Sequence, residues 1–262
     1  MYTAPVFLLS DFGHDDAYVA QMKASVIKVT GTEVLLVDIC HTVPAGDILS
    51  GAFHLKSSLE HLPEGSVVLA VVDPGVGSSR AGLAARWKGR YVIAPDNGLI
   101  SLMGTLDDCR KLPEAPEGSS STFHGRDLFA ICAAYAAVDP DWMQTLKKLE
   151  EPVKLSFLKN TVSDNAIETT VLHVDHFGNC ILNIPDSHRE ITGVYDRAFS
   201  AACDSSLIHT DHYQQGDAKE LMLLAGSQGY LELALNGGSA GAFMGIRAGD
   251  RVTLSSEKGG LQ

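Results

Sequence analysis

Short apolar runs alternate with helical patterns in the first half of the chain, and this alternation restricts the fold more than any other feature. The runs at 5–10, 33–39 and 66–72 are nearly continuously apolar, which is typical of strands buried on both faces of a sheet. The intervening segments 15–30 and 48–61 repeat apolar residues at the spacing of an α-helix. This order predicts an α/β domain in which helices cover a mostly parallel sheet.

Local signals mark the ends of these elements. Gly31 is expected to end the first helix, and Asp47 is expected to cap the start of the second. Two further strands, at 83–87 and 90–94, flank a Lys-Gly turn. The segment 127–138 is expected to form a helix that begins at its aspartate.

The pattern changes after Pro140. Prolines and charged residues predict a first domain over 1–150, a linker at 151–165 and a second domain over 166–262. The second domain has strand-like runs and no long helical periodicity, so we predict a smaller, all-β domain. Its expected strands are 167–175, 179–184, 220–226, 229–236 and 250–256.

Composition argues against several classes of function. The net charge is −12, and no basic patch of the kind that nucleic-acid binding requires is visible. The cysteines are odd in number and form no CxxC pair, which argues against a disulfide framework or a zinc site. The N-terminus lacks the features of a signal peptide, and no apolar run approaches the ~20 residues of a membrane span. We therefore expect a cytoplasmic protein with no nucleic-acid or membrane partner.

Polar residues follow the first strands of the predicted sheet. Asp11, His41 and Asp73 come at three consecutive strand ends, where ligands of α/β sheets bind. Asp15 and Asp16 are explained equally well as acidic caps of a helix, whereas Asp11 lies further upstream and is suited to accept hydrogen bonds from two ribose hydroxyls. An Asp/His cluster is also compatible with a metal, but HxH and HExxH spacings are absent, so we predict no metal site.

The stretch VVDPGVGSSR (71–80) places Asp73 in a glycine turn that Arg80 closes. A surface ion pair at a turn explains this pattern, and so does a polar catalytic site at the end of a strand. A phosphate-binding loop does not explain it, because a strand follows the glycines and the Walker lysine is missing.

Other polar turns carry weaker signals. His124 lies just before a predicted helix, Asp175 and Asn179 flank a Phe-Gly turn, and Ser227 and Gln228 precede a strand. Taken alone, each is explained by a turn or by a structural histidine.

Taken together, these motifs resemble one family. The segments DFG, DDAYVAQMK, VDICHTV, VVDPGVGSSR, APDNGL, TFHGRDLFA, VDHFGN, GYLELALN and GSA occur in this order between residues 6 and 252. They are similar to those of the S-adenosyl-L-methionine (SAM) hydroxide adenosyltransferases, or SAM hydrolases, to which fluorinases and chlorinases are related. The resemblance implies an N-terminal α/β domain, a C-terminal β-barrel-like domain and a homotrimer whose site lies between neighbouring subunits.

The resemblance also implies roles for individual residues. Asp11 would bind the ribose hydroxyls, and Asp73, Arg80 and His124 would handle the attacking water. The remaining substrate contacts would come from Asp175 and Ser227 at the methionine ammonium and carboxylate, Asn179 at the adenine, and Asn236 and Gly237 as backbone lining of the adenine pocket. SAM would be the substrate, and no cofactor is expected.

The chemistry fits these residue types. The leaving group of a sulfonium is a neutral thioether, so no general acid is needed, and the enzyme has to hold a water in line with the sulfur at C5′. Arg80 would stabilise developing hydroxide while His124 and Asp73 orient it. A carboxylate beside arginine is a poor general base, so the proton acceptor stays open. We expect inversion at C5′, with adenosine and L-methionine as products.

Three alternatives compete with hydrolysis: halide transfer, SAM or adenosine binding without turnover, and a metal-dependent hydrolase. The halogenating relatives carry an aromatic residue in place of Asp73 and a Trp in place of Gly46, and a carboxylate would repel a halide. Competent residues at all three water-handling positions argue against a protein that only binds SAM. The resemblance assigns no role to His14 or His41, and Gln228 stands where relatives vary.

Overall fold

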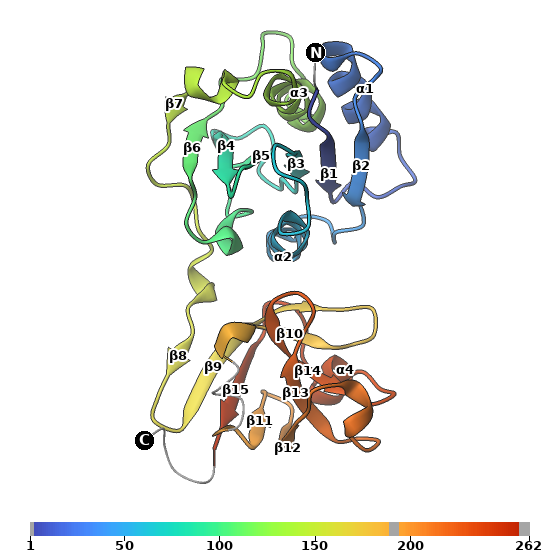
Figure 1. Cartoon of the computed structure of the whole chain (residues 1–262), viewed down its shortest axis with the longest axis vertical. Helices are drawn as coiled ribbons and strands as arrows, with labels where there is room; N and C mark the ends of the chain where they lie inside the picture. Colours follow the sequence, from blue (N-terminus) through green and yellow to red (C-terminus); the bar gives the residue numbers. More distant parts are fainter. Residues whose placement is uncertain (1–2, 189–193, 257–262) are drawn as a thin grey trace. The chain divides into compact units, whose positions relative to one another are not determined.

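The computed structural model describes residues 3–188 and 194–256 (Figure 1). The chain divides into two compact units, Met1–Leu155 and Ser156–Gln262. The division falls inside the segment 151–165 that we predicted as a linker. Part of that segment belongs to the second sheet, because β8 (Thr161–Val162) pairs with β9 (Ala166–Val174) across a short turn.

The first unit is built on a seven-stranded sheet with the order β2-β1-β3-β5-β4-β6-β7. Its strands are β1 (Val6–Ser10), β2 (Leu36–Cys40), β3 (Val67–Val71), β4 (Gly82–Trp87), β5 (Arg90–Pro95), β6 (Asp108–Lys111) and β7 (Lys147–Lys148). The expected parallel pairing holds for β2, β1, β3 and β5, whereas the pairings β5–β4, β4–β6 and β6–β7 are antiparallel. β4 has to be antiparallel to β5, because only the two-residue turn Lys88-Gly89 joins them and both residues have positive φ.

Helices cover both faces of this sheet, in keeping with the predicted α/β layered domain. Figure 1 shows α1 (Tyr18–Thr30) and α3 (Ala130–Val138) on one side and α2 (Ile48–Leu59) on the other. Side chains of adjacent strand residues pack on opposite faces of the sheet. Leu8 belongs to the hydrophobic cluster under α1 and α3, and Leu9 belongs to the cluster that contains Leu55 of α2. The sheet is therefore the middle of three layers.

The helix boundaries follow some of the expected signals. Asp47 caps α2 by accepting a hydrogen bond from the backbone N–H of Ser50, and Gly31 ends α1 with φ of 85°. The acidic pair Asp15-Asp16 does not cap α1, because the helix begins at Tyr18 and has no side-chain cap.

The helix predicted over 127–138 starts differently. A π-helical turn, Gly125–Phe129, precedes α3, so Asp127 lies inside that turn. Its carboxylate accepts hydrogen bonds from the Arg126 guanidinium and from the backbone N–H of Ser120. These bonds tie the start of the helix to the preceding loop.

The second unit is a β-barrel, which confirms the predicted class. Its strand order is β10-β14-β13-β12-β11-β15-β9-β8, and pairing between β10 and β9 closes the ring. Besides β8 and β9, its strands are β10 (Cys180–Pro185), β11 (Arg197–Phe199), β12 (Asp204–His209), β13 (Leu221–Ala225), β14 (Tyr230–Leu235) and β15 (Arg251–Ser255). β11 and β12 were not predicted, and neither was the short helix α4 (Ala240–Met244), which Ser239 caps. Five residues are too few to show a helical period.

Short 3₁₀ turns complete the fold: Ser101–Met103, Trp142–Thr145, Ser156–Leu158 and Tyr213–Gln215. The cysteines are all unpaired. Within residues 3–188 and 194–256, no helix is long and apolar enough to cross a membrane.

Candidate active site

The carboxyl ends of β1, β2 and β3 meet at one edge of the first sheet. The parallel register pairs Leu9 with Cys40 and Ser10 with Val71. Asp11, His41 and Asp73 follow these strand ends, so the structure confirms that they share this edge.

Asp73, Arg80 and His124 form one hydrogen-bonded set. The Arg80 guanidinium donates from Nε to Asp73 Oδ1 at 2.8 Å and from Nη2 to Asp73 Oδ2, which makes a two-pronged ion pair. Nη2 also donates to His124 Nδ1 at 3.1 Å. The Asp73 and Arg80 side chains are only 5% and 10% exposed, so this is not the surface ion pair that the turn alone allowed.

The arrangement sets the tautomer of His124. A guanidinium has donors and no acceptor, so Nδ1 of His124 has to be the accepting nitrogen. In the neutral imidazole the proton then lies on Nε2, which leaves one N–H available outside the set. His124 can therefore offer a donor to a water without breaking its bond to Arg80.

The glycine turn lets two loops approach closely. Gly77 has φ of +80°, and a Cβ at this position would lie 2.6 Å from the backbone oxygen of Ser121. The loop that carries His124 thus packs directly on the turn that carries Arg80. Asn97, after β5, donates from Nδ2 to the backbone oxygen of Val72 at 2.8 Å and so anchors the turn from the other side. The Arg80 guanidinium also stacks over Phe129, 5.0 Å from the ring centre.

Asp11 is half-buried beside the same edge. Its Oδ2 accepts a hydrogen bond from the backbone N–H of Gly46 at 2.8 Å. Within residues 3–188 and 194–256, no protein donor is bonded to its Oδ1. Gly46 has φ of +71°, and a Cβ there would lie 3.5 Å from Pro74, the neighbour of Asp73. Gly46 thus connects Asp11 to the turn that carries Asp73.

In the second unit, Asp175 and Asn179 organise one turn. Asp175 Oδ1 accepts from the backbone N–H groups of Phe177 and Asn179, and Oδ2 accepts from the Asn179 side chain at 3.0 Å. The interpretation of this segment as a structured turn is therefore confirmed. Gly178 packs against Ser239, and its carbonyl accepts from Gly241 N at 3.0 Å. The turn thus lies beside the segment that follows β14.

The other predicted contacts of this unit lie in exposed turns. Asn236 and Gly237 follow β14, and the Asn236 side chain donates to the backbone oxygen of Gly216 at 2.8 Å. Ser227 and Gln228 are exposed between β13 and β14. The structure thus brings Asp175 and Asn179 into one turn beside Ser239, whereas Asn236 contacts Gly216. Among the described residues, no hydrogen bond joins Ser227 to Asp175, Asn179 or Asn236.

Glu232 is a buried carboxylate that the sequence analysis missed. It is 4% exposed, and its Oε1 accepts a hydrogen bond from the Tyr213 hydroxyl. Burial raises the pKa of Glu232, and the nearby charge of Asp175 raises this pKa further. Its signal is the one acidic letter in the apolar strand YLELAL.

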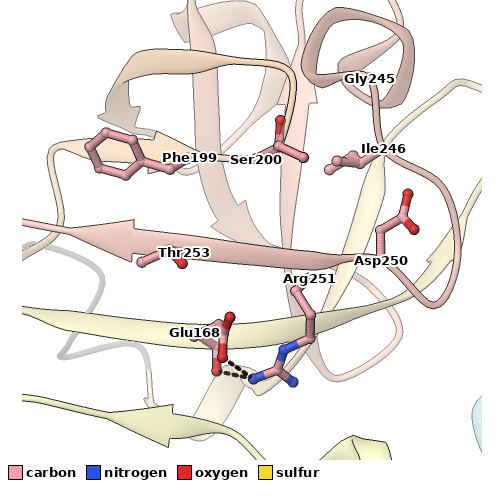
Figure 2. Close-up of a pocket in the computed structure, with 9 residues that line it drawn as sticks. Glu168, Phe199, Ser200, Gly245, Ile246, Asp250, Arg251 and Thr253 are labelled. Atoms are coloured by element: carbon pink, nitrogen blue, oxygen red, sulfur yellow. Dashed lines mark hydrogen bonds and ion pairs between the residues drawn. The ribbon is translucent and has the colours of Figure 1, made fainter.

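The second unit also has a groove of about 370 Å³ (Figure 2). It is lined by Glu168, Phe199, Ser200, Ala201, Gly245, Ile246, Asp250, Arg251 and Thr253, none of which is a predicted site residue. The cation in it, Arg251, is already paired with Glu168 at 2.9 Å. Among the residues that the structure describes, no group of three or more His, Cys, Asp or Glu side chains is arranged to hold a metal ion.

Comparison with known proteins identifies similar chains. The family model of the SAM hydroxide adenosyltransferase N-terminal domain matches residues 6–145, and that of the C-terminal domain matches residues 169–253. The chain is 35% identical to an (R)-S-adenosyl-L-methionine hydrolase from Thermus thermophilus, covering 95% of this chain and 99% of the relative. It is 32% identical to a protein of the same name from Salinispora tropica, covering 94% and 96%.

More distant and structural relatives agree. A fluorinase from Nocardia brasiliensis is 27% identical over 95% of this chain and 96% of its own length. Among solved structures, a conserved protein from Thermotoga maritima superposes with a TM-score of 0.86 at 27% identity, over 95% of this chain and 99% of that one. A conserved protein from Thermus thermophilus superposes with a TM-score of 0.75 at 32% identity, over 96% and 99%.

Proposed function

The chain belongs to the SAM hydroxide adenosyltransferase family, and we propose that it hydrolyses S-adenosyl-L-methionine to adenosine and L-methionine. One structural observation carries this proposal: the half-buried, hydrogen-bonded set of Asp73, Arg80 and His124 at the carboxyl edge of the sheet. It combines a cation, an orienting carboxylate and a free N–H donor, which suits the binding of a water molecule better than the binding of a metal or a phosphate.

The reacting water needs position more than activation. Attack of its oxygen at C5′ forms the C–O bond, the C5′–S bond breaks, and the sulfur keeps the bonding electron pair as a neutral thioether. One proton leaves the water for each turnover. Arg80 would stabilise the developing negative charge on that oxygen, and His124 Nε2–H would fix its direction, so the water approaches in line with the sulfur.

Asp73 would act by orientation. Both of its oxygens already accept hydrogen bonds from Arg80, so its negative charge is paired with the guanidinium. Its role would be to hold the guanidinium in one plane, so that Nη2 reaches His124. The released proton would therefore pass to solvent water.

The remaining assignments complete the substrate site. Asp11 would bind the ribose hydroxyls, and its free Oδ1 supports this role. Asp175 and Ser227 would hold the methionine end, whereas Asn179, Asn236 and Gly237 would contact the adenine. Because relatives carry the name (R)-S-adenosyl-L-methionine hydrolase, we propose that this chain acts on the R epimer at sulfur.

We further propose a cytoplasmic homotrimer that needs no cofactor and completes each site with a neighbouring subunit. The division of the proposed substrate contacts between the two units supports this assembly. Light scattering coupled to gel filtration would measure the trimer, and dialysis against a chelator would leave activity unchanged. A monomer with full activity would contradict the shared site, and loss of activity that added metal restores would contradict the cofactor-free site.

Halide transfer is disfavoured by two residues of the structure. The Asp73 carboxylate points at the cation that would otherwise attract a halide. Gly46 has φ of +71°, a conformation that side chains such as the Trp of halogenating relatives rarely adopt.

Product analysis in ¹⁸O-labelled water tests the proposal. Purified protein would be incubated with each sulfur epimer of SAM, with and without chloride, and the products analysed by liquid chromatography and mass spectrometry. We expect adenosine labelled at the 5′-hydroxyl from the R epimer and unlabelled L-methionine. Tight SAM binding without product would favour a binding protein, and 5′-chloro-5′-deoxyadenosine would favour a halogenase.

A further inference from the structure

A polar hydrogen-bond network, formed by Ser10, His41, Asp38 and Lys23, begins at the residue before Asp11, and the residue roles proposed above do not use it. His41 Nδ1 lies 2.7 Å from the Ser10 hydroxyl, and His41 Nε2 lies 3.1 Å from Asp38 Oδ1. Asp38 Oδ2 in turn accepts from Lys23 of α1 at 2.7 Å. Ser10 and His41 are both fully buried, so this network links the interior of the sheet edge to a surface ion pair.

With His41 neutral, each hydrogen bond in this network has one possible direction. Asp38 accepts from the Lys23 ammonium, and as a carboxylate it also accepts from His41 Nε2–H. The Nδ1 of neutral His41 is then an acceptor, so the Ser10 hydroxyl donates to it. The Ser10 oxygen remains free to accept from the backbone N–H of Phe12 at 3.4 Å. This pattern of bonds requires a neutral His41, and burial favours that form by lowering the pKa of His41.

The loop 41–46, which begins at His41, binds the turn that contains Asp11 at two points. The backbone oxygen of His41 accepts from Gly13 N at 2.7 Å, and Gly46 N donates to Asp11 Oδ2 at 2.8 Å. Ser10, directly before Asp11, is the third point of attachment. Asp11 thus lies in a turn that is held before, at and after the carboxylate.

Burying a hydroxyl and an imidazole in this place is costly unless both are bonded. An apolar residue at position 10 would fill the end of a strand that is otherwise apolar, and it would need no partner. A fully bonded polar pair instead selects one conformation, because any other orientation leaves buried polar atoms without partners. The network is therefore suited to orient its neighbour.

We propose that His41 is a positioning residue which, through Ser10, orients the Asp11 carboxylate toward the two hydroxyls of a ribose. This inference rests on the proposed function, in which Asp11 receives the ribose. Asp38, which is itself paired with Lys23, holds the imidazole in one orientation. The segment 41–46 connects His41 to Gly46, whose backbone N–H binds the Asp11 carboxylate. His41 itself touches no substrate atom.

The test compares two ligands that differ only at the ribose hydroxyls. Binding of adenosine and of 2′,3′-dideoxyadenosine would be measured by calorimetry for the wild type and for Asp11→Asn, His41→Phe, His41→Asn and Ser10→Ala. We expect the wild type to prefer adenosine by ~tenfold or more, as hydrogen bonds to a charged group allow. Asp11→Asn, His41→Phe and Ser10→Ala should lose most of this preference while binding dideoxyadenosine as the wild type does.

His41→Asn provides the rescue, because its amide oxygen stands near the place of Nδ1 and accepts from Ser10. It should keep most of the preference for adenosine. His61→Phe, at an exposed histidine, serves as the matched control and should change nothing. A merely structural role would lower the melting temperature and the affinity for both ligands together.

The outcomes separate the inference from the function on which it rests. If Asp11→Asn loses the preference and both Ser10→Ala and His41→Phe keep it, the positioning role of His41 is refuted. If Asp11→Asn keeps it, the ribose role of Asp11 is wrong, and the inference falls with it. If the wild type discriminates between the ligands but forms no adenosine from SAM, hydrolysis is refuted while the positioning role stands. If His41→Phe does not fold, Ser10→Ala decides, since it removes a single hydroxyl.

Discussion

Replacing Arg80 by Lys keeps the charge of the set formed by Asp73, Arg80 and His124 and removes its geometry. Arg80 donates from Nε and Nη2 to the two oxygens of Asp73, and Nη2 also reaches His124. A lysine side chain has one ammonium nitrogen at the end of a flexible stem, so it cannot bind both Asp73 oxygens and His124 in one plane as the guanidinium does. We expect Arg80→Lys to retain its charge balance and lose the bond to His124.

The loss follows from the number of charge-assisted contacts. Breaking one prong to Asp73 and the bond to His124 removes two contacts, each of which is worth about 1.5–3 kcal/mol when buried. Lysine recovers part of the first, so we expect a loss of about 3–4 kcal/mol of transition-state stabilisation, which is about 10²–10³ in kcat. The melting temperature should also fall, because the same contacts stabilise the folded state, but the fall is limited because Asp73 keeps a cation beside it.

The assay is adenosine formation from SAM at saturating substrate, followed by chromatography, with thermal unfolding measured in parallel. Arg110→Lys is the matched control, since Arg110 donates from Nε to both oxygens of Asp108 in the same unit, with side chains 20% and 13% exposed. This control should leave kcat within about a factor of two. An Arg80→Lys protein with kcat within threefold of the wild type would refute the argument that the fork geometry matters.

Three further predictions concern stability. Gly77→Ala should lower the free energy of unfolding, measured by chemical unfolding, by about 2–3 kcal/mol and should reduce kcat, because Gly77 combines a positive φ with a close approach to the Ser121 oxygen. Gly65→Ala is the control, because Gly65 also has a positive φ but lies in open space. His41 is buried, Asp38, Lys23 and His14 face its imidazole, and its pKa is lowered, so the unfolded state takes up this proton first as the pH falls. The free energy of unfolding should therefore fall as the pH drops below about 6.5. His41→Asn should flatten this slope in melting curves, and an unchanged slope would contradict the assignment. Glu232 has a raised pKa, so the ionisation of its carboxyl group above pH ~4.5 opposes folding. The Glu232→Gln side chain still accepts a hydrogen bond from Tyr213, so this variant should raise the melting temperature at pH 8 and not at pH 4. An equal shift at both pH values would contradict a charge effect.

Sequence reasoning succeeded where the decisive energies are local. Asp47 caps its helix, Gly31 ends another, and the Lys88-Gly89 turn makes a hairpin, because each depends on the backbone within a few residues. The same holds for the strand ends at Asp11 and Asp73. The order of the motifs was sufficient to identify the family, since that order needs no coordinates.

Sequence reasoning failed where neighbours in space compete with neighbours in the chain. Asp127 was expected to cap a helix, but Arg126 and Ser120 N bind its carboxylate inside a π-helical turn. Asp15 and Asp16 precede α1 without capping it, because the helix begins only at Tyr18. β11 and β12 were missed because a short strand is stabilised mainly by the strands that flank it.

By itself, the sequence determined which chemical groups this protein has and roughly where each strand delivers them: a carboxylate and an arginine at one glycine turn, a histidine before a helix, and an aspartate after the first strand. Only the tertiary structure decided which of them touch. Arg80 meets His124 across 44 residues, and Ser10 meets His41 across 31, because the parallel sheet brings distant strand ends to one edge. Such contacts depend on strand order and on the exclusion of water, and no local pattern of residues encodes either.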